Sequence, residues 1–161
     1  MTHPTDTDPT IATVAVLGAG LMGHSIALEF ALAGLQVRLT DRDAAALDRS
    51  QQWIADDLAA LVAFGVADAA RADAALARIR PTPDLAAAVA GADLVVEAVS
   101  EDLDLKRRLF ADLDARCPPT TILASNTSSF VPSLLATAVR RPERLLVTHY
   151  FNPAQGLPLV E

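Results

Sequence analysis

The sequence GAGLMG at residues 18–23 constrains the fold of this chain more than any other feature. It has the form G-x-G-x-x-G and follows a short apolar run at residues 11–17, which is rich in β-branched residues and indicates a buried strand. A helical pattern begins directly after it, at residues 22–33. A glycine turn between a strand and a helix is typical of the first βαβ unit of a dinucleotide-binding sheet.

The three glycines of this turn have different expected roles. We expect Gly18 to allow the tight turn, Gly20 to let the backbone approach a pyrophosphate, and Gly23 to let the helix pack against the strand. Leu21 and Met22 complete the turn, where the start of the helix offers free amides and a partial positive charge to a phosphate.

Asp41 specifies which dinucleotide the turn receives. It lies 18 residues after Gly23, at the end of a second predicted strand at residues 36–40. A carboxylate at this position accepts hydrogen bonds from the adenosine ribose and repels the 2′-phosphate of NADP. The sequence therefore predicts NAD as the cofactor, and we expect the neighbouring Arg42 to point to solvent.

The rest of the chain alternates predicted strands with predicted helices. Further strands are expected at residues 79–82, 94–98, 121–125 and 145–150, and further helices at 44–63, 68–78, 85–90, 102–116 and 133–139. This alternation predicts a Rossmann-type, doubly wound α/β fold, with a mostly parallel sheet and helices on both faces. The helices at 44–63 and 68–78, separated by Phe64-Gly65, predict a helical hairpin insertion that leans off the sheet after the second strand.

Composition narrows the class of protein further. The length of 161 residues suits one domain, which we assign to residues 11–161, after a polar leader at 1–10 that we expect to be flexible. The net charge of −7 argues against nucleic acid as a partner, and no apolar run is long enough for a membrane helix. A single cysteine, Cys117, excludes an internal disulfide and favours a cytoplasmic location.

Four sequence stretches, taken together and in this order, resemble one known protein family. They are VAVLGAGLMGHSIA, ADLVVEAVSEDLDLKRRLFADLD, ILASNTSSF and HYFNPAQGLPLVE. Through them, residues 11–161 resemble the NAD-binding domain of the 3-hydroxyacyl-CoA dehydrogenase family. The resemblance implies NAD-dependent oxidation of a 3-hydroxyacyl thioester, carried by coenzyme A or by a carrier protein, to the 3-oxoacyl thioester.

The resemblance also implies roles for residues of the later stretches. His149 matches the catalytic histidine, Glu161 its carboxylate partner, and Ser128 and Asn152 residues near the reacting oxygen of the substrate. A histidine can accept the alcohol proton near neutral pH, a carboxylate can fix its tautomer, and hydroxyl and amide groups can orient the alcohol.

Other matched positions concern the cofactor. Glu101 and Lys106 match positions along the nicotinamide side of the cleft, and Ser128 is expected to contact the cofactor as well as the substrate. We expect no metal ligands.

Two departures from the family keep other functions open. The family continues into a helical C-terminal domain that binds substrate and forms a homodimer, and we expect that domain to be absent from this chain. The predicted hairpin contains no lysine, whereas relatives that bind coenzyme A often have lysine there. One alternative is a carnitine- or gulonate-dehydrogenase-like enzyme for a free hydroxy acid or polyol; another is a catalytically silent NAD-binding fragment. Enzymes of the β-hydroxyacid dehydrogenase type are less favoured, because Lys106 lies in a different sequence context from their catalytic lysine.

Overall fold

Six parallel strands form the central sheet of the computed structural model, which describes residues 11–157 and 159–161; the predicted leader at 1–10 lies outside the described residues. The strands are β1 (Thr13–Leu17), β2 (Gln36–Thr40), β3 (Ile79–Thr82), β4 (Leu94–Glu97), β5 (Ile122–Ser125) and β6 (Leu145–Val147), in the spatial order β3-β2-β1-β4-β5-β6. Strand β1 pairs with β2 on one side and with β4 on the other. The winding therefore changes direction between β1 and β4, and ligands of open α/β sheets bind beside such a point, at the carboxyl ends of the strands.

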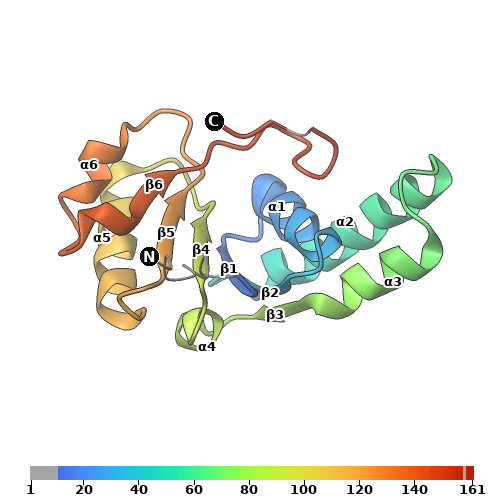
Figure 1. Ribbon diagram of the computed structural model, residues 1–161, viewed down its shortest axis with the longest axis horizontal. Coiled ribbons are helices and arrows are strands. Elements are labelled where there is room, and N and C mark those ends of the chain that lie inside the picture. The colour runs from blue at the N-terminus through green and yellow to red at the C-terminus, as the bar shows by residue number, and fades with distance from the viewer. Residues whose placement is uncertain (1–10, 158) are drawn as a thin grey trace, which may run out of the picture.

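Helices cover both faces of the sheet, as Figure 1 shows. One face carries α1 (Leu21–Leu32), α2 (Ala44–Ala63) and α3 (Ala69–Arg78); the other carries α4 (Leu85–Val89), α5 (Leu103–Arg116) and α6 (Pro132–Ala136). Alternate residues of β1 supply the two cores, since Val14 and Val16 pack in the first and Ala15 and Leu17 in the second. This arrangement confirms the predicted fold class.

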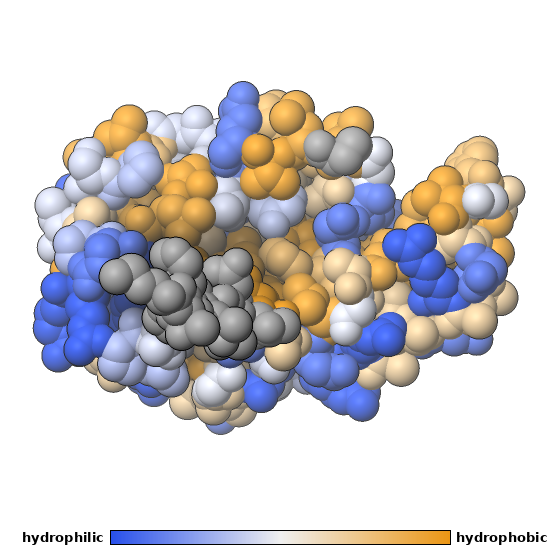
Figure 2. All heavy atoms as spheres, in the orientation of Figure 1, coloured by the Kyte–Doolittle hydropathy of each residue, from blue (hydrophilic) through white to orange (hydrophobic). Residues whose placement is uncertain are grey.

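The predicted hairpin insertion is confirmed. Helices α2 and α3 extend beyond the sheet on one side of the molecule (Figure 1) and are joined through Phe64 and Gly65, which has a φ of +70°. Apolar side chains gather toward the hairpin tip (Figure 2), where Phe64 is 84% exposed and Val66 61% exposed. Among the described residues, none of the helices is long and apolar enough to cross a membrane.

The final strand is shorter than its sequence pattern predicts. Strand β6 ends at Val147 instead of at residue 150, because the amide of Tyr150 donates to Asn126 Oδ1 at 2.9 Å and not to a neighbouring strand. Residues 148–157 then cross the carboxyl end of the sheet toward α1 (Figure 1). Helix α6 also differs from the predicted 133–139, since the structure has the helix at Pro132–Ala136.

Candidate cofactor and active site

Two adjoining hollows lie at the carboxyl ends of the strands. The first, of about 360 Å³, lies beside Gly18, Gly20 and Asp41, at the ends of β1 and β2. The second, of about 510 Å³, lies between the start of α1 and the residues that follow β4, β5 and β6. Residues 98–100 line both hollows, so they form one continuous cleft across the point where the winding of the sheet changes.

The glycine turn forms the edge of this cleft, and its three glycines differ in what surrounds them. Gly18 has a φ of +98°, and a Cβ there would lie 2.5 Å from Ala98 O. A Cβ on Gly23 would lie 1.7 Å from Gly18 O, so Gly23 is restricted by the turn itself and Gly18 by the backbone that follows β4. A Cβ on Gly20 would meet no atom within 4 Å, so the fold leaves open space there that a ligand can use.

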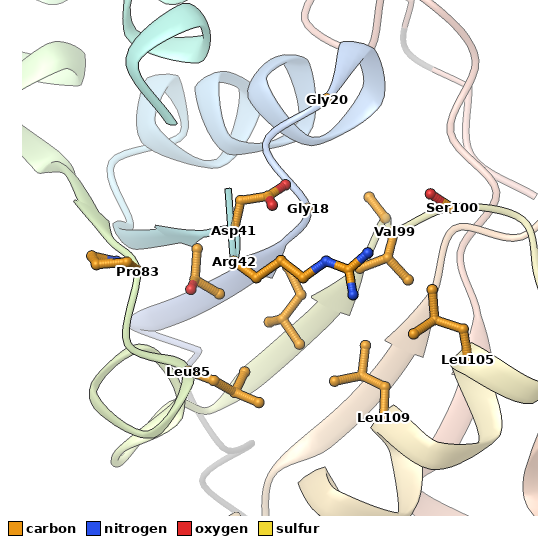
Figure 3. Close-up of a pocket in the computed structure, with 13 residues that line it drawn as sticks. Gly18, Gly20, Asp41, Arg42, Pro83, Leu85, Val99, Ser100, Leu105 and Leu109 are labelled. Atoms are coloured by element: carbon orange, nitrogen blue, oxygen red, sulfur yellow. The ribbon is translucent and has the colours of Figure 1, made fainter. Parts of the chain in front are cut away.

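Asp41 is held beside the turn by two backbone amides. Its Oδ2 accepts a hydrogen bond from Ala19 N at 2.8 Å, and its Oδ1 accepts one from Asp43 N at 2.9 Å. The close-up in Figure 3 shows the carboxylate facing the glycine turn. Arg42 differs from expectation: it is exposed, but its guanidinium reaches across the first hollow toward Val99 instead of turning away from it (Figure 3).

His149 and Glu161 meet beside the second hollow. The distance from His149 Nδ1 to Glu161 Oε2 is 3.4 Å, a long hydrogen bond of the kind that tightens when substrate binds. The backbones of the two residues are also paired, with His149 N donating to Glu161 O at 2.8 Å and Glu161 N to His149 O at 3.0 Å. The imidazole is 27% exposed and lies 4.8 Å from the ring of Phe151, so it is partly sheltered yet accessible.

Ser128 and Asn152 line the same hollow as His149, and so do Leu21 and Met22 from the start of α1. These residues come from three separate parts of the chain, and the fold brings them together at the ends of β1, β5 and β6. The chemistry-bearing residues of the last two sequence stretches therefore face the end of the glycine turn.

A buried ion pair supports the floor of the second hollow. Lys106 is 1% exposed and Glu97 0%, and Lys106 Nζ lies 2.5 Å from Glu97 Oε1 and 3.1 Å from Glu101 Oε2. Burial raises the pKa of Glu101, but the hydrogen bond from Thr127 and the ion pair with Lys106 outweigh it and hold that pKa below its usual value. Glu101 therefore remains an anion with a fixed orientation, since it also accepts from Ser129 N at 3.2 Å.

Glu97 and Asn126 belong to this site, although the sequence patterns did not single them out. Glu97 ends the apolar strand β4; besides Lys106, it accepts hydrogen bonds from Ser125 Oγ at 2.5 Å and Val99 N at 2.8 Å. A carboxylate that ends a fully buried strand requires a partner, and Lys106, nine residues later and the only lysine, was the available signal. Asn126 offered no comparable signal, because its contact with Tyr150 N depends on the path of the chain after β6.

A second polar cluster connects α1 with the hairpin. His24 is buried; its Nδ1 lies 3.0 Å from Gly20 O and its Nε2 3.3 Å from Asp57 Oδ2 on α2. The same carboxylate oxygen accepts from Gln155 Nε2 at 2.8 Å, and Gln155 is hydrogen-bonded to Ser25. The cluster joins the helix of the glycine turn, the hairpin and the segment that follows His149.

Comparison with known proteins decides the family. The model of the 3-hydroxyacyl-CoA dehydrogenase NAD-binding domain matches residues 13–161. This chain belongs to the 3-hydroxyacyl-CoA dehydrogenase family. It is 44% identical over 151 residues to 3-hydroxyadipyl-CoA dehydrogenase of Escherichia coli, which covers 94% of this chain and 32% of that protein.

Solved structures of related enzymes support the same family assignment. A 3-hydroxybutyryl-CoA dehydrogenase from Escherichia coli matches with a TM-score of 0.90 and 43% identity, over 94% of this chain and 32% of that one. An (S)-3-hydroxybutyryl-CoA dehydrogenase from Ralstonia eutropha matches with a TM-score of 0.89 and 35% identity, over 94% of this chain and 53% of that one. The chain thus spans about a third to a half of these relatives, and what it covers is their NAD-binding domain.

The cleft fits the cofactor of this family. The open space beside Gly20 admits a pyrophosphate at the start of α1, where free amides and the helix dipole favour an anion. The Asp41 carboxylate stands where the adenosine ribose would offer its hydroxyls, and the hollow beside His149 continues from there. NAD is therefore the cofactor for which this site is built.

Proposed function

We propose that this chain supplies the cofactor site and the catalytic histidine of an NAD-dependent enzyme that oxidises a 3-hydroxyacyl thioester to the 3-oxoacyl thioester. The observation that carries the proposal is the single cleft, in which the glycine turn and Asp41 lie at one end and His149, Ser128 and Asn152 at the other. The names of the relatives, which include 3-hydroxyadipyl-CoA and 3-hydroxybutyryl-CoA dehydrogenases, support coenzyme A thioesters as the substrate class.

His149 is the general base of the proposed reaction. Its Nδ1 faces Glu161, which leaves Nε2 to accept the proton of the substrate hydroxyl. The Glu161 carboxylate fixes the tautomer and stabilises the imidazolium that forms, as carboxylates do in other histidine pairs. NAD, when bound, would supply the hydride acceptor for the carbon that bears this hydroxyl, so that loss of a hydride from the carbon and of the hydroxyl proton to His149 would leave a ketone.

Ser128 and Asn152 orient the substrate in this proposal. Both line the hollow of His149, and a hydroxyl and an amide there can donate hydrogen bonds to the substrate oxygen as it becomes a carbonyl. Ser128 lines the same hollow as Glu101 and Lys106, and in this proposal it also contacts the nicotinamide end of the cofactor. We assign Glu101 and Lys106 to the cofactor side of the cleft, with Lys106 acting through the orientation of Glu101.

The remainder of the enzyme completes the site. We infer that a helical domain closes the substrate cleft and forms a homodimer, and the exposed apolar residues Leu157, Leu159 and Val160 beside the catalytic segment give such a domain a surface to cover. We infer a reducing, cytoplasmic setting because Cys117 is a buried free thiol.

Turnover by the complete protein tests the proposal. We expect it to oxidise NADH with acetoacetyl-CoA, and to lose this activity on His149→Ala while the affinity for NADH is kept. Because the hairpin contains arginine but no lysine, L-carnitine and L-gulonate with NAD serve as comparison substrates. Activity on one of these without activity on acetoacetyl-CoA would refute the thioester assignment, and activity on none would favour a silent NAD-binding module.

A further inference from the structure

We propose that Ser25 of α1, Asp57 of α2 and Gln155 form a polar clamp that positions residues 149–154, which we call the active-site segment, against the helix of the glycine turn. The three residues line neither hollow of the cleft, so they act through the place that they give to the active-site segment. The inference rests on the proposed function, because that segment carries residues of the proposed reaction.

Ser25 is the centre of the clamp. It is buried, and its Oγ accepts a hydrogen bond from Ala154 N at 2.8 Å and donates one to the side-chain oxygen of Gln155. A serine within a helix can donate to the carbonyl one turn earlier, but this hydroxyl is directed to a part of the chain 129 residues away. Because Ala154 is buried as well, the bond is shielded from water and joins α1 to the end of the active-site segment.

Asp57 fixes the orientation of the Gln155 amide. Its Oδ2 accepts from Gln155 Nε2 at 2.8 Å and lies 3.3 Å from His24 Nε2. A carboxylate can only accept, so the nitrogen of Gln155 must face Asp57 and its oxygen must face the hydroxyl of Ser25. The clamp therefore depends on the order of donors and acceptors along three side chains from three parts of the chain.

The clamp supplies the polar contacts that hold residues 151–157 to the rest of the domain. Among the described residues, every hydrogen bond between this stretch and residues 11–148 involves Ser25 or Asp57. Without the clamp this stretch, which contains Asn152, would be free to shift against α1.

The same helix also carries the cofactor turn. Helix α1 begins at Leu21, directly after Gly20, and Ser25 follows within two turns. One rigid element therefore sets the spacing between the pyrophosphate position and the active-site segment. A displacement of about 1 Å in reacting groups can lower a rate by about 100-fold, so the clamp acts on kcat and not on NADH binding.

An exchange of partners within the clamp tests the proposal in the complete protein. Gln155→Glu keeps the shape of the side chain but places a second carboxylate beside Asp57, and the two repel. The double variant Asp57→Asn/Gln155→Glu reverses donor and acceptor and restores a hydrogen bond between the two positions. Gln52→Glu is the matched control, because Gln52 Nε2 donates to Asp56 Oδ1 at 2.9 Å on the exposed surface of the same helix.

Each variant is measured by turnover of acetoacetyl-CoA, NADH titration, thermal melts and hydrogen exchange of the amides of residues 151–157. We expect Gln155→Glu to lower kcat by about tenfold to 100-fold, with NADH affinity and melting temperature close to those of the wild type. The double variant should regain about tenfold of this loss, and Gln52→Glu should match the wild type. Hydrogen exchange should be faster in Gln155→Glu and return toward the wild-type rate in the double variant.

Ser25→Ala is the second variant and should lower kcat in the same range; it decides the question if Gln155→Glu does not fold. Unchanged kcat in the folded variant would overturn the proposal, as would a loss that the double variant does not recover. A parallel loss of NADH affinity and kcat would show that the clamp supports the turn and does not position the segment. A wild type without turnover would instead refute the proposed function, while unchanged hydrogen exchange in Gln155→Glu would overturn the clamp itself.

Discussion

The Asp41 carboxylate accepts a hydrogen bond from the amide of Ala19, 22 residues earlier in the chain, at a distance of 2.8 Å. Through this bond the end of β2 and the glycine turn after β1 hold each other in place. The residue proposed to select NAD over NADP is therefore also a structural part of the turn that receives the pyrophosphate. Substitutions at Asp41 have to preserve this acceptor if their effect on cofactor choice is to be measured.

Gly20→Ala and Gly23→Ala are predicted to fail in different ways. A methyl group at Gly20 meets nothing within 4 Å, so Gly20→Ala should melt close to the wild-type temperature but lose NADH binding, because the methyl occupies the path of the pyrophosphate. A methyl group at Gly23 collides with Gly18 O, so Gly23→Ala should be destabilised by about 2 kcal/mol or more. Thermal melts and NADH fluorescence titrations of both variants check this. Normal NADH binding by Gly20→Ala would contradict the assigned position of the pyrophosphate.

His149→Ala should lower kcat of the complete protein by about 100- to 10,000-fold, because the alcohol proton loses its acceptor. Glu161→Gln should lower kcat less, since an amide oxygen at 3.4 Å can still hold the tautomer but stabilises the imidazolium poorly. Both variants should bind NADH as the wild type does, which separates a catalytic role from a role in cofactor binding. A parallel loss of NADH affinity and turnover in His149→Ala would show that His149 acts on the fold of the cleft instead.

Lys106→Met should destabilise the domain by about 3–5 kcal/mol, because it leaves the Glu97 carboxylate buried without its cation. The double variant Glu97→Gln/Lys106→Met should recover part of this loss, since it removes both charges. Urea unfolding of the single and double variants measures the difference. If the double variant were no more stable than Lys106→Met, the charge of Glu97 would not be the cause.

The lowered pKa of Asp114 leads us to expect that the free energy of unfolding of the domain depends on pH. Burial raises the pKa of Asp114, but the hydrogen bonds and ion pairs from Arg140 and Arg144 outweigh this and hold the pKa far below its usual value. A lowered pKa in the folded state means that the carboxylate stabilises the fold above the ordinary pKa of about 4, and that this contribution is lost as the pH falls below it.

Asp114→Asn should therefore cost about 3–5 kcal/mol at pH 7, because Arg144 remains buried with its partner gone, and should flatten the fall in stability below pH 4. Urea unfolding between pH 3 and pH 7 is the measurement. Asp112→Asn is the control, since the Asp112–Arg116 pair is exposed and is worth about 0.5 kcal/mol. Equal pH dependence in Asp114→Asn and the wild type would exclude Asp114 as the group responsible.

Much of this fold follows from local sequence. The apolar runs that form β1 and β4, the aspartates that begin α2, α3 and α5, and the break at Gly65 are local signals, and the structure has an element boundary at or next to each. The glycine turn is a local sequence signal as well, although a Cβ at Gly18 is excluded by the backbone of Ala98 and Val99, which follow β4 and lie far from Gly18 in the sequence.

The structure differs from the sequence-based predictions where segments that are distant in the sequence contact each other. Residues 148–150 have the composition of a strand, but Asn126 and Glu161 take the backbone groups that a longer β6 would require. The contacts of His24 and Ser25 are long-range too, because α2 and the segment after His149 place Asp57 and Gln155 against them. Arg42 was expected in solvent because sequence alone does not show that the first hollow lies within reach of its side chain.

The proposed reaction requires that NAD is the dinucleotide held in this cleft. Isothermal titration calorimetry of the chain with NADH and then NADPH tests that claim directly. We predict one saturable site for NADH, with an affinity about tenfold or more above that for NADPH because of the fixed Asp41 charge. Equal affinities for the two cofactors, or the absence of saturable binding of NADH, would contradict it.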